Sequence, residues 1–297
     1  MKRILIILSF FSLLFFLFSC QKETKQFDIT TTMFFQYDVV NQIVDNKMSV
    51  SLVTPLEIDI HNYEPTPKTI KNINNSKLFL YTSNLIEPWA QKINLTTGNK
   101  FNISTHLDNN LNNGHEDSHY WTSPETFVTI INLILSEIIK IDPDNKTYYE
   151  TNATNYKNEI IQVSDDFLGY LATKNLKTIF YVGHNSMSAF ATFFGINIIP
   201  IVDDIRPDHD ITAKEIVKIV EAIKNLRPSH LFIPELTTDK FTKTIQNELK
   251  SENLNLKILE LHGYHNLTAN DYKSHISYLD LLTRNINNLK ESWDNND

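Results

Sequence analysis

The chain is poor in cysteine and glycine, and each shortage excludes a class of site. Cys20 is the single cysteine, which rules out a framework of intrachain disulfides and any zinc site built mainly from thiolates. Only 6 glycines occur among 297 residues, and neither Gly-x-Gly-x-x-Gly nor the phosphate-binding Gly-x-x-x-x-Gly-Lys motif is present. The sequence therefore gives no support to the standard nucleotide-binding loops.

An excess of positive charge is missing as well. Lysine and arginine number 27 against 35 acidic residues, and the formal net charge is -8. A nucleic-acid partner needs a basic surface to neutralise phosphates, so this balance argues against one. Hydrophobic residues make up 41% of the chain, which is enough for packed cores and, at this length, for two domains of ordinary size. We expect the protein to act as a monomer.

Long apolar runs are also scarce, apart from one at the start of the chain. Lys2 and Arg3 precede an apolar stretch over 4–18, which is shorter than a comfortable membrane span and typical of a signal peptide. The stretch ends in Leu-Phe-Ser-Cys at 17–20, which resembles a bacterial lipobox. We predict a lipoprotein signal peptide over 1–19, a lipidated Cys20 and a polar tether over 20–26. The alternative is a plain export signal or an uncleaved anchor with an incidental cysteine.

The rest of the chain alternates between strand-like and helix-like stretches. Strands are predicted at 27–32, 48–55, 77–81, 178–182, 197–201, 230–233 and 257–261. Helices are predicted at 34–44, 66–75, 86–93, 187–194, 212–225, 240–250 and 272–290. Such alternation favours an α/β fold with parallel sheets. We expect two lobes of this kind, an N-terminal one over 27–141 and a C-terminal one over 176–297.

The segment 142–175 between the two lobes has a different pattern. Apolar residues recur there at spacings of three and four, at Tyr149, Ala153, Tyr156, Ile160, Val163, Phe167 and Leu171. Pro143 suits the first turn of a helix. The spacing predicts one helix of about 30 residues, roughly 45 Å long. Because flexible hinges are usually rich in glycine or serine, we expect this helix to connect the lobes rigidly.

Histidines in four separate segments are the candidate metal ligands. They are His61, His119, His184 and His262, with His265 as a rival to the last of these. Taken one at a time, they are better explained as residues of a surface turn, a loop beside Trp121, a helix start and a solvated turn. Most of them follow predicted strands, and the carboxyl ends of parallel strands face one crevice, so together they predict a shared metal site. Glu235 is a further candidate, although a carboxylate that begins a helix explains it equally well.

The motifs around these histidines resemble a known family. The run Ile-Asp-Ile-His-Asn-Tyr-Glu-Pro-Thr-Pro at 58–67 looks like the His-x-Tyr-Glu-Pro-Thr-Pro signature of the TroA-like zinc and manganese solute-binding proteins of ABC importers. Asp-Ser-His-Tyr-Trp-Thr-Ser-Pro at 117–124 resembles the Asp-Pro-His-x-Trp-Leu-x-Pro segment of that family, with Ser118 in place of proline. The block 184–195 and the segment from Asp142 onward also resemble family elements.

The resemblance implies two lobes, a rigid connecting helix and one metal in the cleft between the lobes. It implies that His61, His119 and His184 are ligands. His262 stands where the family commonly has a ligating aspartate, and His265 remains its rival. The long histidine-rich loop of some zinc members is missing, and His106 and His115 are all that remain there as possible transient metal-collecting groups.

Ligand chemistry, the leader and the family resemblance together predict a function. Three or four imidazoles suit Zn²⁺, whereas Mn²⁺ prefers more oxygen ligands. Imidazole binds metal only when it is neutral, so affinity should fall below about pH 6.5. We therefore expect a receptor in the bacterial cell envelope, lipid-anchored or periplasmic, that captures Zn²⁺ for an ABC permease and is not an enzyme. The alternatives are a manganese-binding homologue, a surface adhesin with a structural zinc, and a zinc hydrolase with Glu235 or Asp203 as base.

Overall fold

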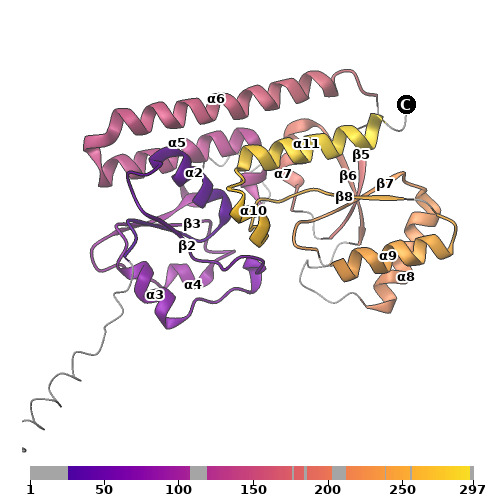
Figure 1. The fold of residues 1–297 in the computed structure, drawn as a ribbon, viewed down its shortest axis with the longest axis horizontal. Helices are drawn as coiled ribbons and strands as arrows, with labels where there is room; N and C mark the ends of the chain where they lie inside the picture. Colours follow the sequence, from indigo (N-terminus) through magenta and orange to yellow (C-terminus); the bar gives the residue numbers. More distant parts are fainter. Residues whose placement is uncertain are drawn as a thin grey trace, which may run out of the picture.

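The computed structural model describes residues 26–107, 119–175, 177–183, 186–202, 212–237, 239–254 and 256–294. Two α/β lobes lie side by side, and the long helix α6 (Lys146–Leu171) runs along one side of the molecule (Figure 1). This arrangement confirms the predicted two-lobed fold. Within the described residues, no helix has both the length and the apolarity needed to cross a membrane.

The N-terminal lobe is built on a four-stranded parallel sheet with the strand order β2-β1-β3-β4. Its strands are β1 (Ile29–Thr31), β2 (Val50–Leu52), β3 (Leu78–Tyr81) and β4 (Asn99–Asn102). Its helices are α2 (Phe34–Val44), α3 (Pro67–Asn74), α4 (Pro88–Gln91) and α5 (Pro124–Ile141). All residues of β1 and β3 are buried, because helices cover both faces of a parallel sheet.

The C-terminal lobe repeats this plan in a second parallel sheet, with the order β6-β5-β7-β8. Its strands are β5 (Thr178–Val182), β6 (Asn197–Val202), β7 (His230–Ile233) and β8 (Lys257–Glu260). Its helices are α7 (Ser188–Phe194), α8 (Ala213–Leu226), α9 (Asp239–Ser251), α10 (Ala269–Lys273) and α11 (Tyr278–Asp294). In each sheet the first strand in sequence lies between the second and the third, so the carboxyl ends of the strands gather at one edge.

Local sequence signals set the helix starts in both lobes. The Thr66 side chain accepts a hydrogen bond from the Thr69 N–H at the start of α3, with Pro67 in the first turn. The Thr212 hydroxyl accepts one from the Glu215 N–H, and the Glu215 side chain accepts one in return from the Thr212 N–H. This reciprocal capping box satisfies two backbone donors that would otherwise lack helical partners.

The connecting helix is continuous, as its periodicity predicts. A 3-10 turn at Pro143–Asn145 leads into α6, whose buried residues are Tyr149, Ala153, Tyr156, Ile160, Ser164, Phe167 and Leu171. Val163, which the pattern also placed inward, is partly buried against the core. The buried stripe holds α6 against the N-terminal lobe at one end and against Trp293 of α11 at the other, where Phe167 stacks on the indole.

Other predictions of secondary structure need correction. The helix expected over 272–290 is two helices, and the chain turns between them at His275, whose φ is 55°. The helix expected over 86–93 is the single turn α4. Strand β4 and helix α5 were not predicted.

Asp38 joins three helices at the junction between the lobes. Its carboxylate accepts hydrogen bonds from the Tyr156 hydroxyl of α6 at 2.5 Å and from the Tyr278 N–H at the start of α11 at 3.2 Å. The side chain is 5% exposed. Burial raises the pKa of Asp38 to about 6, although the hydrogen bonds from Tyr156 and Tyr278 oppose the rise.

This pKa makes stability depend on pH in a defined direction. Because the native carboxyl binds its proton more tightly than the unfolded one, the stability that Asp38 contributes is full below about pH 4 and is lost as pH rises through 6. In Asp38→Asn the amide oxygen still accepts from Tyr156 and Tyr278. We therefore compare the two proteins by the difference in their free energies of unfolding, variant minus wild type. We expect this difference to rise by up to about 3 kcal/mol between pH 4 and pH 7, because only the wild type loses the stability that the protonated carboxyl contributes.

The measurement is urea unfolding at half-unit pH steps. The matched control is Asp165→Asn on the exposed side of α6, whose difference from wild type should stay constant. A constant difference for Asp38→Asn as well would contradict the assignment.

Candidate metal centre

Three imidazoles converge between the lobes. His61, His119 and His265 each offer one ring nitrogen, and the three nitrogens lie within 4.8 Å of one another. Their ring centroids are 5.6 Å apart for His61 and His119, 5.1 Å for His119 and His265, and 6.1 Å for His61 and His265. Nitrogens bound to one tetrahedral zinc stand about 3.4 Å apart, given bond lengths of about 2.1 Å. Small ring rotations therefore suffice to bind one ion.

His61 is presented by a short turn that its own sequence defines. It lies in the 3-10 turn Ile60–Asn62, and the Asp59 carboxylate at the start of this turn accepts a hydrogen bond from the His61 N–H at 3.0 Å. Pro65 and Pro67 follow and restrict the backbone. His61 is exposed, whereas His119 and His265 are buried, so the cluster is accessible from the side of His61.

Trp121 supports the other two imidazoles. Its ring is fully buried and lies 5.3 Å from the rings of both His119 and His265. It stacks on Phe35 of α2 at 5.0 Å, and its indole N–H donates a hydrogen bond to the Gly263 carbonyl at 2.9 Å. The Thr122 hydroxyl and N–H both donate to the His119 carbonyl at 3.0 Å. The buried indole of Trp121 therefore limits how far the rings of His119 and His265 can rotate.

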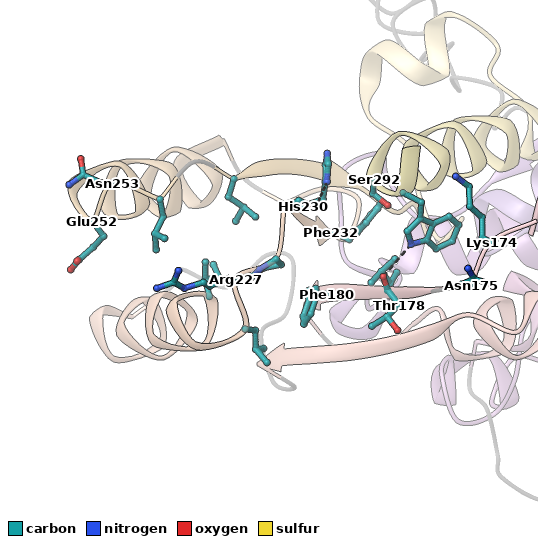
Figure 2. Close-up of a pocket in the computed structure, with 18 of the residues that line it drawn as sticks. Lys174, Asn175, Thr178, Phe180, Arg227, His230, Phe232, Glu252, Asn253 and Ser292 are labelled. Atoms are coloured by element: carbon teal, nitrogen blue, oxygen red, sulfur yellow. Dashed lines mark hydrogen bonds between the residues drawn. The ribbon is translucent and has the colours of Figure 1, made fainter. Parts of the chain in front are cut away.

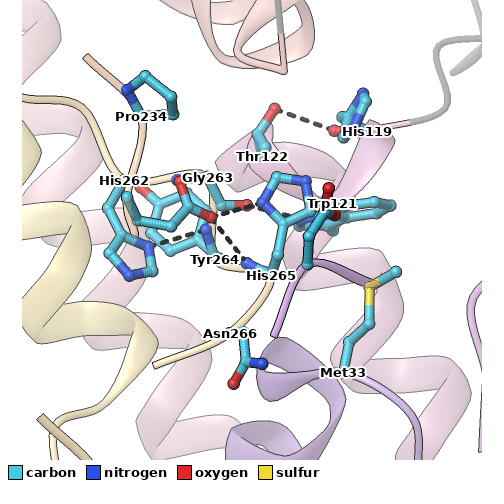
Figure 3. Close-up of polar contacts among 12 residues, drawn as sticks. Met33, His119, Trp121, Thr122, Pro234, His262, Gly263, Tyr264, His265 and Asn266 are labelled. Carbon is cyan, nitrogen blue, oxygen red and sulfur yellow. Dashed lines mark hydrogen bonds and ion pairs between the residues drawn. The ribbon is translucent and has the colours of Figure 1, made fainter. Parts of the chain in front are cut away.

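His265 has a buried carboxylate as its partner. Its ring Nδ1 lies 2.5 Å from an oxygen of Glu235, and this carboxylate also accepts hydrogen bonds from the N–H groups of Gly263 and His265 (Figure 3). Burial alone would raise the pKa of Glu235, but the neighbouring imidazoles of His265 and His262 and these hydrogen bonds outweigh it and lower the pKa below its ordinary value. Since Nδ1 is engaged, Nε2 is the nitrogen of His265 that suits a metal.

His262 lies outside the cluster, contrary to the first choice made from the sequence. In Figure 3 its ring is on the far side of the Gly263–Tyr264 turn from His265. Its Nδ1 accepts a hydrogen bond from the Tyr264 N–H at 2.9 Å, and its backbone is held on both sides by the Asn285 amide at 2.7 and 2.9 Å. His262 therefore stabilises the turn that presents His265, which was the rival.

Several predicted residues cannot be compared with the structure. Cys20, His115, Asp117, Ser118, His184 and Asp203 lie outside the described residues. His106 is described: its ring stacks on Phe101 at 4.1 Å, and its Nδ1 lies 2.9 Å from the Asn102 carbonyl.

A known family matches almost the whole described chain. The family model of ZnuA, described as zinc-uptake complex component A, periplasmic, matches residues 29–292. The chain belongs to this family. The resemblance seen in the sequence motifs is thereby confirmed.

Named relatives of this ZnuA-family chain agree with the assignment. The high-affinity zinc uptake system protein ZnuA of Bacillus subtilis is 28% identical over 293 residues, which is 92% of this chain and 90% of the relative. The zinc-binding lipoprotein AdcA of Streptococcus pneumoniae is 23% identical over 317 residues, and the match spans 99% of this chain but 62% of AdcA.

Solved structures share the fold. The metal-dependent lipoprotein YcdH of Bacillus subtilis has a TM-score of 0.75 and 27% identity, covering 89% of this chain and 98% of its own. The Zn(II)-bound ZnuA-like domain of Streptococcus pneumoniae AdcA has a TM-score of 0.77 at 21% identity, covering 91% of this chain and 100% of its own. The laminin-binding protein Lmb of Streptococcus agalactiae, described as an adhesin with metal-transporting activity, has a TM-score of 0.73 at 22% identity and covers 89% of this chain and 98% of its own.

The position of His265 depends on contacts that cross between the lobes. The connecting segment 262–277 leaves β8 of the C-terminal sheet and packs on the N-terminal lobe. The His265 carbonyl accepts a hydrogen bond from the Phe34 N–H at 3.0 Å, and the Leu267 carbonyl accepts one from the Glu57 N–H at 3.1 Å. The Asn266 amide donates to the carbonyls of Pro55 and Ile58. The backbone around His265 is therefore held on the N-terminal lobe, while its ring contacts Glu235 of the C-terminal lobe.

A groove in the C-terminal lobe lies away from this cluster. It has a volume of about 1200 Å³ and is lined at the amino ends of β5 and β7 by Thr178 and His230, and around them by Arg227, Glu252 and Trp293 (Figure 2). None of the three clustered histidines lines it. Because the cluster forms where strands end and the groove lies where strands begin, the two are separate features of the fold.

Gly263 allows the close approach of His265 and Glu235. A Cβ at this position would lie 2.7 Å from Cε1 and 2.8 Å from Nδ1 of His265, and 3.2 Å from a Glu235 oxygen. We expect Gly263→Ala to displace the imidazole and weaken metal binding by about tenfold, while lowering the free energy of unfolding by only about 1 kcal/mol.

The measurements are metal titration and thermal unfolding. The matched control is Gly169→Ala on α6, where a Cβ meets nothing within 4 Å. Alanine is the better helix former there by about 1 kcal/mol, so the control should gain stability and keep its affinity. Equal affinities for the two variants would show that the space at Gly263 is irrelevant to the site.

Proposed function

We propose that this chain is an extracytoplasmic receptor that captures Zn²⁺ and delivers it to an ABC permease. The convergence of His61, His119 and His265 is the observation that carries the proposal. Membership of the ZnuA family and the zinc named in the relatives' descriptions support it. Because members of this family are components of transport systems, the family membership also argues against an enzymatic function.

The proposed ligands are His61, His119 and His265, with His184 as a fourth from its sequence motif. An all-imidazole shell favours Zn²⁺ over Mn²⁺, because Mn²⁺ prefers carboxylate and water oxygens. The nearby carboxylate of Glu235 does not alter this preference, since its oxygens accept hydrogen bonds from His265 and Gly263. For the same reason Glu235 is a poor general base for a hydrolase. The structural likeness to an adhesin extends to the fold alone.

The contacts between the lobes support a mechanism without wide hinge motion. The chain passes between the lobes through α6, through the connecting segment 262–277 and through α11. Asp38 ties α2 to α6 and α11, and Trp121 ties the N-terminal lobe to Gly263. A wide opening would break these buried hydrogen bonds together. Release at the permease would then follow from small displacements around the metal.

Attachment to the membrane is the remaining part of the proposal. Cleavage before Cys20 and acylation of its sulfur would leave residues 20–26 as a tether before β1, which begins at Ile29. Several acyl chains are needed for stable anchoring, as one chain binds only marginally. The receptor would then remain near its permease at the outer side of the membrane.

The ligand assignment predicts different effects for two histidines three residues apart. His265→Ala should weaken zinc binding at least about 100-fold, which corresponds to about 3 kcal/mol, because it removes a ligand. His262→Ala should leave the affinity within about threefold and lower the free energy of unfolding by about 1 kcal/mol through loss of its hydrogen bond to Tyr264.

Calorimetry and metal analysis of the purified chain measure both, with His61→Ala as a second ligand variant. Unchanged zinc stoichiometry and affinity in His61→Ala and His265→Ala would remove the proposed site. A large loss in His262→Ala alone would restore the first choice from the sequence.

The anchor is tested separately by Cys20→Ala in the full chain. We expect the variant to lose incorporation of labelled palmitate and to keep zinc binding, because Cys20 precedes the folded lobes by several residues. Labelling of the variant at the wild-type level, measured after expression in a bacterium, would contradict acylation at this cysteine.

A further inference from the structure

A histidine that binds a metal uses one ring nitrogen, and the partner of the other nitrogen decides whether it is ready to do so. When that partner accepts a hydrogen bond, the proton stays on the second nitrogen and the first keeps its lone pair for the metal. The partner also fixes the rotation of the ring. A carboxylate is an effective partner, because a charged acceptor makes a stronger hydrogen bond than a neutral one.

Glu235 has the geometry of such a partner for His265. It follows β7 in the C-terminal lobe and is 4% exposed. One oxygen lies 2.5 Å from Nδ1 of His265 and accepts the His265 N–H at 3.3 Å, and the other accepts the Gly263 N–H at 2.7 Å. The carboxylate thus contacts the backbone and the ring of the turn that carries the ligand.

We propose that Glu235 is a positioning residue for zinc binding, which keeps the proton of His265 on Nδ1 and directs Nε2 towards His61 and His119. The inference rests on the proposed zinc site and assigns to it a residue that does not itself touch the ion. The sequence had offered Glu235 as a ligand or a base. Among the described residues, Glu235 is not part of the cluster of ligand atoms that lie within 4.8 Å of one another, and both of its oxygens accept hydrogen bonds from the turn at 263–265.

The surroundings of the pair allow little freedom. Trp121 packs edge-on against the His265 ring, with an interplanar angle of 87°, on the side of the N-terminal lobe. Gly263 leaves no room for a side chain between the ring and the carboxylate. The ring is therefore held between an indole from one lobe and a carboxylate from the other. A small displacement of the lobes would act first on the contact between Glu235 and His265.

The test is Glu235→Gln in the full chain purified in detergent. Glutamine can turn its oxygen to the Nδ1–H of His265, but its NH₂ group then faces the Gly263 N–H, so one of the two contacts is lost in either orientation. We expect zinc affinity to fall by about 10–100-fold, with the stoichiometry unchanged. The matched control is Glu260→Gln in β8, which removes the same charge from a carboxylate that pairs with Arg284. Its affinity should stay within about twofold of wild type.

A spectroscopic measurement separates positioning from a general loss of structure. Solid-state nuclear magnetic resonance of chain labelled with ¹⁵N in its histidine rings distinguishes the two tautomers, and His265→Gln identifies the resonances of His265. In wild type at pH 8 we expect a protonated Nδ1 and an unprotonated Nε2, with zinc shifting Nε2. Glu235→Gln should show a mixture of tautomers before zinc is added. The wild-type spectrum tests the tautomer even if the variant does not fold.

The outcomes distinguish this inference from the proposed function. A wild-type His265 protonated on Nε2, or zinc bound through Nδ1, overturns the positioning role. So does wild-type affinity in Glu235→Gln with an unchanged tautomer. In these cases zinc binding by the wild type still stands. Failure of the wild type to bind zinc overturns the proposed function and the positioning role with it.

Discussion

The hydrogen bonds between the connecting segment 262–277 and the N-terminal lobe are the constraint on which the site depends. Residues on opposite sides of α6 in sequence meet there, because the His265 carbonyl accepts from the first turn of α2 and the Asn266 amide spans the carbonyls of Pro55 and Ile58. Asn266 is 1% exposed, so these bonds form away from water, where an unmade partner is costly. Without this docking, two imidazoles would face a solvent-filled gap.

The same region links the histidine cluster to the arrangement of the lobes. Tyr278 stacks on Phe127 and on Tyr264, and its N–H reaches Asp38. The aromatic stack thus runs from α5 of one lobe to the turn beside His265. Packed elements of this kind move as units, because interiors resist compression. A displacement of the turn beside His265 would therefore reach α5 and α11 through direct contacts of Tyr278.

Much of the fold could be predicted from sequence, since both sheets and α6 follow hydrophobic periodicity. Strand β4 was not predicted because its sequence is polar: Asn99 and Lys100 are exposed at the edge of the sheet. The break before α11 has no glycine or proline to mark it. Of the clustered histidines, His61 and His119 were expected from their motifs, whereas His265 lies in the cluster and His262 outside it, on either side of Tyr264, whose φ is 63°. No sequence pattern marks a tyrosine whose backbone is in the left-handed region. The contacts that bury Glu235 are equally invisible in the sequence.

The late position of His265 in the chain sets the order in which the site can assemble. Residues 26–107 and 119–175 contain a complete sheet and its covering helices, yet they supply two of the three clustered imidazoles. The third, His265, follows β8 and lies 90 residues beyond residue 175, as 265 minus 175 is 90. An ion that needs all three imidazoles could therefore bind only after the segment behind the second sheet has returned to the first lobe.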